Sequence, residues 1–302
     1  MPIAKKTRRK TPIKSHAKAE AASPLPDLRT MESLLAAITG SRTASRADDA
    51  SAKAQEFVYA AWEEASPRKR VALARKALSV SPLCADALNI LAEAAGSAAE
   101  ARDLYASAVD AATLTLGPEA FQEYEGHFWG FLETRPYMRA RAGLAGALQE
   151  LGEEDAAIGH YRDMLKLNPN DNQGIRYVLA ACLLRREAEL ALNQLLGQYP
   201  DEASTVWLYT KALMAFREGH ADTTQAIALV NSAWAENEHV PAMLAGTKRS
   251  VVARGGYVMV GGPDEASLYV ADFGLAWHRT SGAVAWLARI TATLPRSTSA
   301  LN

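Results

Sequence analysis

Arginine and carboxylate side chains crowd one stretch of the chain, which reads FWGFLETRPYMRA. Glu133, Arg135 and Arg139 lie within it, and Arg141 follows directly after it. A guanidinium binds a carboxylate through two parallel hydrogen bonds. Arginines at this density therefore favour either recognition of a carboxylate-bearing partner or an internal network of ion pairs. The sequence leaves both interpretations open.

Polar and aromatic side chains gather again further along, in the stretch NPNDNQGIRY. Both stretches come at the beginning of a predicted helix, and we expect these two helices to line the same groove. An arginine-rich groove that also contains a tyrosine suits an extended peptide or a carboxylate. The predicted partner-binding residues are Glu133, Arg135, Arg139, Asn172, Arg176 and Tyr177.

Residue types that commonly carry catalysis or bind metals are scattered. The six histidines stand far apart. Beside His127, Glu123 stands at helical spacing, four residues earlier, with Glu125 between them. A metal site needs three or four convergent ligands, and these residues of one helix fall short. The phosphate-binding loop, the zinc-protease motif and the nucleophile elbow are absent from the sequence. We therefore predict no metal, no cofactor and no catalytic residue, and we interpret the chain as not being an enzyme.

The FWGFLETRPYMRA stretch is predicted to be a joint between helices. Proline is tolerated in the first turn of a helix and disfavours helical geometry in the residue before it. A helix should therefore begin near Pro136, with Thr134 or Arg135 as its cap. The aromatic residues of the stretch are then expected to lie in the core; these are Phe128, Trp129 and Phe131.

The clearest repeat unit follows this joint and runs from Pro136 to Pro169. Small and aliphatic residues recur at helical spacing in two successive segments. Gly152 separates the segments, because glycine readily adopts the left-handed conformation that ends a helix. Tyr161 stands among the inward positions of the second segment, and Asn168-Pro169 ends it. The pattern is typical of the tetratricopeptide repeat, in which two helices pack as a pair.

Fainter copies of the second helix of this unit recur along the chain. They span residues 70–82, 101–109, 188–200 and 224–234. The closing prolines Pro169 and Pro200 lie 31 residues apart, which is shorter than the usual period of about 34 residues. Each unit needs neighbours to bury its apolar face, so five such units predict an all-α, tetratricopeptide-like superhelix.

Two regions are expected to depart from the repeat. One extra helix is predicted between residues 117 and 134, opened by Pro118. The glycine-rich segment 248–262 is expected to be either a packed loop or a small hairpin. A helix should begin at Pro263, with acidic residues in its first turn, and a last helix should span 282–293. The two final helices are predicted to cap the repeats.

Charge is divided unevenly along the chain. The first 30 residues carry eight basic and two acidic side chains, whereas the remainder has a net charge of −7. The basic segment lacks the apolar core of a secretory signal, and its composition cannot offset the entropy lost on ordering. Apolar runs long enough to span a bilayer are absent from the sequence. The predicted organisation is a disordered basic tail at 1–28, helical repeats at 29–240, and a C-terminal loop with capping helices at 241–302.

The two cysteines, Cys84 and Cys182, have no partner at the spacing of a metal site. We expect both to be buried, reduced thiols, as is usual in a cytoplasmic protein.

The motifs ETRPYMRA and NPNDNQGIRY resemble those of the bacterial relatives of the suppressor-of-tumorigenicity-7 family of tetratricopeptide-like proteins. The resemblance extends from Trp129 to Leu287, and it implies a helical-repeat adaptor with no catalytic activity to carry over. Animal members have membrane segments that this sequence lacks, so their location does not transfer. The residues that match the two motifs are Glu133, Thr134, Arg135, Pro136 and Tyr137, and then Asn170, Asp171, Asn172, Gln173, Arg176 and Tyr177.

We interpret the chain as a non-catalytic, cytoplasmic adaptor that binds a protein or peptide partner in the concave groove of its repeats. A chaperone-type carboxylate clamp is not expected, because Ala142 and Gly146 occupy the corresponding positions of the clearest repeat. The alternative is a nucleic-acid-associated repeat protein that uses the basic N-terminal tail. The negative charge of the remaining chain argues against nucleic-acid binding by the repeats themselves.

Overall fold

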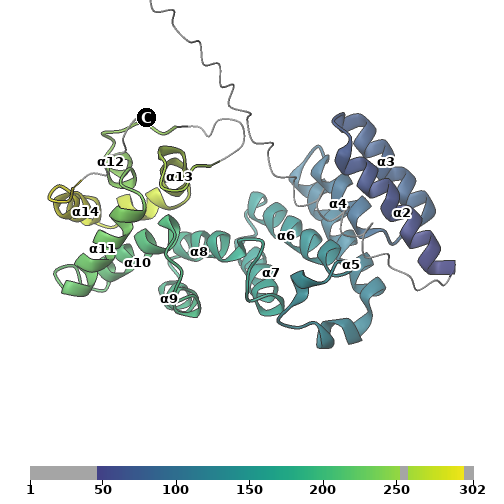
Figure 1. The fold of residues 1–302 in the computed structure, drawn as a ribbon, viewed down its shortest axis with the longest axis horizontal. Helices are drawn as coiled ribbons and strands as arrows, with labels where there is room; N and C mark the ends of the chain where they lie inside the picture. Colours follow the sequence, from purple (N-terminus) through teal and green to yellow (C-terminus); the bar gives the residue numbers. More distant parts are fainter. Residues whose placement is uncertain (1–45, 252–257, 296–302) are drawn as a thin grey trace, which may run out of the picture. The chain divides into compact units, whose positions relative to one another are not determined.

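Figure 1 shows the computed structural model of the chain, in which residues 46–251 and 258–295 are described. These residues form helices and connecting turns, with no β-strand among them. The predicted tail at 1–28 lies outside the described residues. The helices are α2 (Arg46–Glu63), α3 (Pro67–Val80), α4 (Ala85–Glu93), α5 (Ala98–Glu123), α6 (Arg135–Glu150), α7 (Glu154–Leu167), α8 (Ile175–Arg185), α9 (Glu189–Gln198), α10 (Thr205–Arg217), α11 (Thr224–Glu236), α12 (Val240–Leu244), α13 (Pro263–Arg279) and α14 (Ala283–Thr291), with one short 3₁₀ turn, η1 (Phe128–Gly130).

Consecutive helices pack in pairs (Figure 1). Helix α2 packs on α3, α4 on α5, α6 on α7, α8 on α9 and α10 on α11, and each pair also contacts the next one. The four fainter repeat copies predicted from the sequence correspond to α3, α5, α9 and α11, which are the second helices of their pairs. The described residues therefore confirm the prediction of an all-α, tetratricopeptide-like superhelix.

The α6–α7 pair shows how the sequence produces this packing. Helix α6 carries Pro136 in its first turn, as predicted. Gly152 adopts a φ of 79° between the two helices, a backbone conformation that residues other than glycine rarely take. The ring of Tyr161 is buried between the helices, and its hydroxyl donates a hydrogen bond to Gln149 Oε1 at 2.6 Å. The pair is thus fixed by a tight turn, a buried ring and this hydrogen bond, together with those that Arg141 of α6 donates to His160 and Asp163 of α7.

A glycine allows α5 and α6 to approach closely. A Cβ atom added at Gly143 of α6 would lie 2.2 Å from Cε1 of Tyr105 in α5, far inside van der Waals contact. The Tyr105 ring therefore occupies the space that any other residue at position 143 would need.

The extra helix expected between residues 117 and 134 forms only in part. Gly117 adopts a φ of 71° and interrupts α5, and Pro118 begins the continuation, which ends at Glu123. The 3₁₀ turn η1 follows. Gly126, with a φ of 88°, turns the chain between these two segments and prevents one continuous helix.

The aromatic residues of the joint are divided between core and surface. The Phe128 ring is fully buried and meets Tyr137 edge-on, with 5.7 Å between ring centroids. Trp129 is half-buried, and Phe131 is 36% exposed while stacking on Tyr124 at 4.0 Å. The prediction that all three aromatic residues are core therefore holds fully for Phe128 and in part for Trp129, which packs against the core, and it is wrong for Phe131. The tight 3₁₀ turn sends its successive side chains in different directions.

The C-terminal helices pack on the last repeat pairs. Helix α13 contacts α12 and the two first helices α8 and α10, and α14 contacts α11 and α12. Both predicted helices are confirmed, since α13 begins at Pro263 and α14 falls within 282–293. Trp277 is buried and donates a hydrogen bond to the Tyr269 hydroxyl at 2.8 Å. In the segment expected as a loop or hairpin, residues 248–251 and 258–262 contain no strand, and 252–257 lie outside the described residues.

Candidate protein-interaction surface

Arg139, one of the predicted groove residues, is engaged inside the molecule. Its Nε and Nη2 donate hydrogen bonds to the two carboxylate oxygens of Asp86 in α4, at 2.9 and 2.6 Å. The Arg139 side chain is 12% exposed and the Asp86 side chain is fully buried. The guanidinium also lies 5.0 Å from the ring centroid of Trp62, and Asn89 donates to Asp86 at 3.1 Å. This pair ties α4 to α6.

Arg176 is engaged in the same way two helices later. Its Nε donates to Glu202 at 3.0 Å and its Nη1 donates to Asp171 at 3.1 Å. The Tyr177 hydroxyl donates to the same Glu202 carboxylate at 2.9 Å, and the guanidinium lies 4.4 Å from the Tyr177 ring centroid. Glu202 precedes α10 and Arg176 lies in the first turn of α8. The network therefore joins two neighbouring helix pairs.

The other predicted residues lie at the edges of these two networks. Arg135 donates from Nε to the Trp129 carbonyl at 3.1 Å and stacks over the Trp129 ring. Glu133 and Asn172 are exposed, and Asn172 accepts a hydrogen bond from Asn168. Three predicted residues thus lie at or just before the start of α6, and three at or just before the start of α8. The internal ion-pair network, one of the two interpretations that the sequence left open, is present.

The carboxylates that complete these networks could not be identified from local sequence. Asp86 precedes Arg139 by 53 positions, and Glu202 follows Arg176 by 26, so no helical spacing connects them. A third link of this kind joins α10 to α13, where Thr205 Oγ1 donates to Glu265 at 2.9 Å. Only the packing of the helix pairs brings these residues together.

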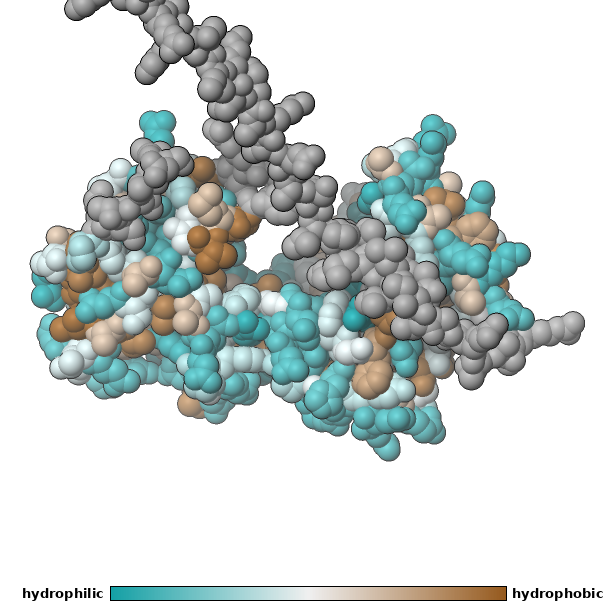
Figure 2. All heavy atoms as spheres, viewed as in Figure 1, coloured by the Kyte–Doolittle hydropathy of each residue, from teal (hydrophilic) through white to brown (hydrophobic). Residues whose placement is uncertain are grey.

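Large apolar side chains are exposed along one face of α13 and just before it. Among the described residues, six of the thirteen exposed large hydrophobic side chains fall between Val251 and Leu275. Leu268 and Leu275 are 52% and 54% exposed and lie two turns apart, with Ala271 between them. The other face of α13 is buried in the core, so this helix carries apolar side chains on two faces. The exposed face also carries Asp272, between the two leucines. Figure 2 shows hydrophobic side chains gathered over α13 on the face viewed.

Acidic side chains in the first turn of α13 hold the turn that precedes it. The Met259 amide donates to Asp264 at 2.9 Å, and the Gly261 amide donates to Glu265 at 2.8 Å. The hydrogen bond from the Met259 amide favours the charged carboxylate and lowers the pKa of Asp264. Met259 and Val260 are 68% and 76% exposed. Their apolar side chains are therefore presented from a hydrogen-bonded turn.

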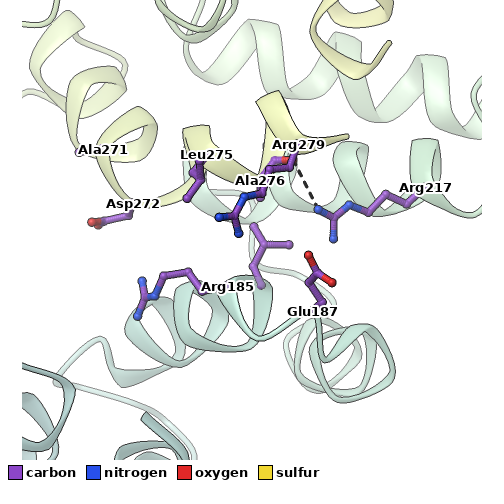
Figure 3. Close-up of a pocket in the computed structure, with 9 residues that line it drawn as sticks. Arg185, Glu187, Arg217, Ala271, Asp272, Leu275, Ala276 and Arg279 are labelled. Atoms are coloured by element: carbon purple, nitrogen blue, oxygen red, sulfur yellow. Dashed lines mark hydrogen bonds between the residues drawn. The ribbon is translucent and has the colours of Figure 1, made fainter. Parts of the chain in front are cut away.

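A polar pocket adjoins this surface where α13 meets the ends of α8 and α10. Its volume is about 130 Å³. Figure 3 shows Leu275 and Arg279 entering from α13, Arg217 from α10 and Glu187 from the end of α8. Arg217 is held by a hydrogen bond from Nε to the Thr280 hydroxyl at 2.9 Å, and its Nη2 lies 3.5 Å from the Ala276 carbonyl oxygen. Apolar side chains bordered by polar groups are typical of protein interfaces. We call the exposed face of α13, the turn before it and this pocket the α13 surface.

Both cysteine thiols have a pKa that is changed by burial. Burial raises the pKa of the Cys84 and Cys182 thiols to about 11, so both stay protonated at neutral pH. Both cysteines are free and buried, as predicted. The described residues contain no group of three or more His, Cys, Asp or Glu side chains that could hold a metal ion. Within 46–251 and 258–295, no helix has the length and hydropathy required to cross a bilayer.

A protein-family model described as "ST7 protein" matches residues 42–294. The chain belongs to the ST7 family. The resemblance found in the two motifs is thereby confirmed, and the match is wider than the Trp129–Leu287 region in which it was first seen. The family model covers all five helix pairs and both final helices.

Curated members of the family align over most of this chain. The "Protein ST7 homolog" of Drosophila melanogaster is 26% identical over 261 residues, which cover 78% of this chain and 48% of that protein. The "Suppressor of tumorigenicity 7 protein-like" of Rattus norvegicus is 26% identical over 248 residues, covering 74% of this chain and 44% of that protein. The chain therefore spans about half the length of the curated relatives it matches.

Two solved structures are similar at a low level. YrrB, described as a TPR protein with an unusual peptide-binding site, has a TM-score of 0.41 at 16% identity and covers 64% of this chain and 93% of its own. BtubC (BKLC) from P. vanneervenii has a TM-score of 0.40 at 15% identity and covers 86% of this chain and 98% of its own. At these TM-scores neither structure supports an inference about the site. The repeat architecture rests on this chain's own helix pairs.

Proposed function

We propose that this ST7-family chain is a helical-repeat adaptor that binds a protein partner through the α13 surface. The observation that carries the proposal is the concentration of exposed apolar side chains on α13 and in the turn before it. Single exposed leucines are normal on any protein, but a group of them marks an interaction site. Burial of the second apolar face of α13 by a partner would remove this surface from water.

The spacing and charge of the α13 surface favour a partner with an apolar helix face. Leu268 and Leu275 lie two turns apart, which is the spacing at which one helix packs along another. Arg279 lies on the same face, one turn beyond Leu275. Among the described residues Arg279 has no ion-pair or hydrogen-bond partner. A carboxylate on the partner would pair with it.

The proposal also includes the concave groove along the first helices. Helix α13 contacts α8 and α10, which are first helices, so it lies on the side of the repeats where the predicted groove is expected. Glu133 and Asn172 are exposed and Tyr177 is half-buried, which supports direct contact with a partner. Arg135, Arg139 and Arg176 are engaged within the chain, and we assign them the role of holding the first helices in position.

A double substitution on the α13 face tests this function. Leu268→Glu with Leu275→Glu is expected to remove at least one protein that the wild-type chain captures from a lysate of its native cells, with the melting temperature unchanged. The matched control is Leu114→Glu with Leu190→Glu, since these leucines are 71% and 75% exposed on α5 and α9. The control should capture the same proteins as wild type. Identical capture by wild type and both variants would overturn the proposal.

A further inference from the structure

A cleft opens on the opposite helices of the repeats, between α7 and α9. Its volume is about 770 Å³, which is within the range of about 300–1,000 Å³ that binding pockets commonly have. In Figure 1 both helices lie on the same side of α8, below it in this view. The bottom is formed by leucines of all three helices, each less than 10% exposed; these are Leu165, Leu179, Leu183 and Leu195.

The cleft follows the C-terminal halves of two second helices. Its lining runs from Arg162 to Pro169 at the end of α7 and from Ala191 to Tyr199 in α9, with Leu179 and Leu183 of α8 between them. At one end the Tyr199 hydroxyl donates a hydrogen bond to the Pro169 carbonyl at 3.0 Å, which closes the cleft there.

The rim of the cleft is positively charged. Arg162 and Lys166 of α7 line one side, and the glutamines Gln194 and Gln198 of α9 line the other. No acidic residue lines the cleft. Arg162 is exposed and has no partner among the described residues. Lys166 is 72% exposed and forms a surface ion pair with Glu125 at 3.2 Å, for which a partner's carboxylate would compete. This rim contrasts with the net charge of −7 carried by the chain after its first 30 residues.

We propose that the α7–α9 cleft is a second docking site, which takes a peptide segment with two or three apolar side chains flanked by carboxylates. The apolar side chains lie over the leucines, and the carboxylates pair with Arg162 and Lys166. The site is separate from the α13 surface, and the two proposals are tested independently. An adaptor with both sites joins two different proteins on one chain.

The experiment uses two synthetic peptides and the full chain. The first peptide carries leucines spaced three and four residues apart with glutamates at both ends, and the second has lysines in place of the glutamates. Fluorescence anisotropy should show that the acidic peptide binds at least about tenfold more tightly than the basic one. The double variant Arg162→Glu with Lys166→Glu should bind the acidic peptide about tenfold or more weakly than wild type does. It should bind the basic peptide more tightly.

A substitution inside the cleft separates binding there from attraction to the surface. Ala191→Trp fills the cleft from α9 and should abolish binding of the acidic peptide. Two variants should bind like wild type: Arg75→Glu with Lys76→Glu, which makes the same charge change on α3, and Leu268→Glu with Leu275→Glu on α13. Thermal unfolding confirms that each variant is folded. Equal affinity for the two peptides, unchanged binding by Ala191→Trp, or absence of binding by wild type would overturn the second site.

Discussion

Arg139 and Asp86 illustrate, at the scale of single residues, how this chain uses its arginines. The Asp86 carboxylate is fully buried, and Arg139 supplies its countercharge through two hydrogen bonds. Arg139→Ala would leave a buried carboxylate without that charge, which typically costs about 3–5 kcal/mol. We expect a loss of this order in the free energy of unfolding, measured by chemical denaturation.

The matched control for this prediction is Arg186→Ala. Arg186 pairs with Asp155 at 2.9 Å, but both side chains are largely exposed. Exposed pairs contribute little to stability, so this variant should unfold close to wild type. Equal and small effects of the two substitutions would show that the Arg139 pair does not hold α4 and α6 together.

Glu202 gives a pH-dependent prediction at the same scale. Burial alone would raise the pKa of this carboxyl, but hydrogen bonds from Ser204, Arg176 and Tyr177 outweigh burial and lower the pKa. A carboxyl with a lowered pKa in the folded state stabilises the fold at pH values above its unfolded pKa of about 4.3. That contribution is lost as the pH falls through the folded value.

The measurement compares wild type with Glu202→Gln. The variant should be less stable than wild type at pH 6–7, and the difference should shrink as the pH falls below about 4.3. Thermal unfolding at a series of pH values gives this difference directly. A difference in stability between wild type and Glu202→Gln that stays constant with pH would show that the Glu202 charge does not stabilise the network.

Helices α5 and α6 supply the prediction at the scale of secondary-structure elements. Gly143→Ala places a Cβ within 2.2 Å of the Tyr105 ring, and overpacking of this kind costs about 1–3 kcal/mol. Gly146→Ala, one turn later on the same helix, has no atom within 4 Å of the added Cβ. It should leave stability unchanged or raise it by up to about 1 kcal/mol, since alanine is the better helix former.

Chemical denaturation of the two alanine variants checks this contrast. Helices α5 and α6, which belong to neighbouring pairs, can approach closely only if position 143 carries no side chain. The comparison separates that requirement from helix propensity. Destabilisation of both variants to the same extent would mean that α5 and α6 do not pack as closely as described.

The sequence predicts the elements better than it predicts the surfaces. Pro136, Gly152 and Pro263 act through local backbone geometry, so the helix boundaries beside them are correct. Asp86 meets Arg139 only through tertiary packing, so its role could not be read from spacing. The exposed leucines of α13 were missed for another reason: a helix with two apolar faces gives no indication of which face the core will use.

At the scale of the whole molecule, the packing of the helices creates the two surfaces. The cleft lies between the second helices α7 and α9, and α13 departs from the repeat to lie on α8 and α10 with one apolar face uncovered. The repeat units could be predicted from the sequence. The cleft depends on how three helices pack, and it follows only from the structure.

The central claim is that the α13 surface binds a protein partner, and site-specific photo-crosslinking tests it most directly. A photoreactive amino acid in place of Leu275, in the full chain expressed in its native cells, should give a distinct crosslinked species of higher mass. The same amino acid in place of Leu114 of α5, which is 71% exposed against 54% for Leu275, should not. The same crosslinked species from both positions, or none from position 275, would contradict the account.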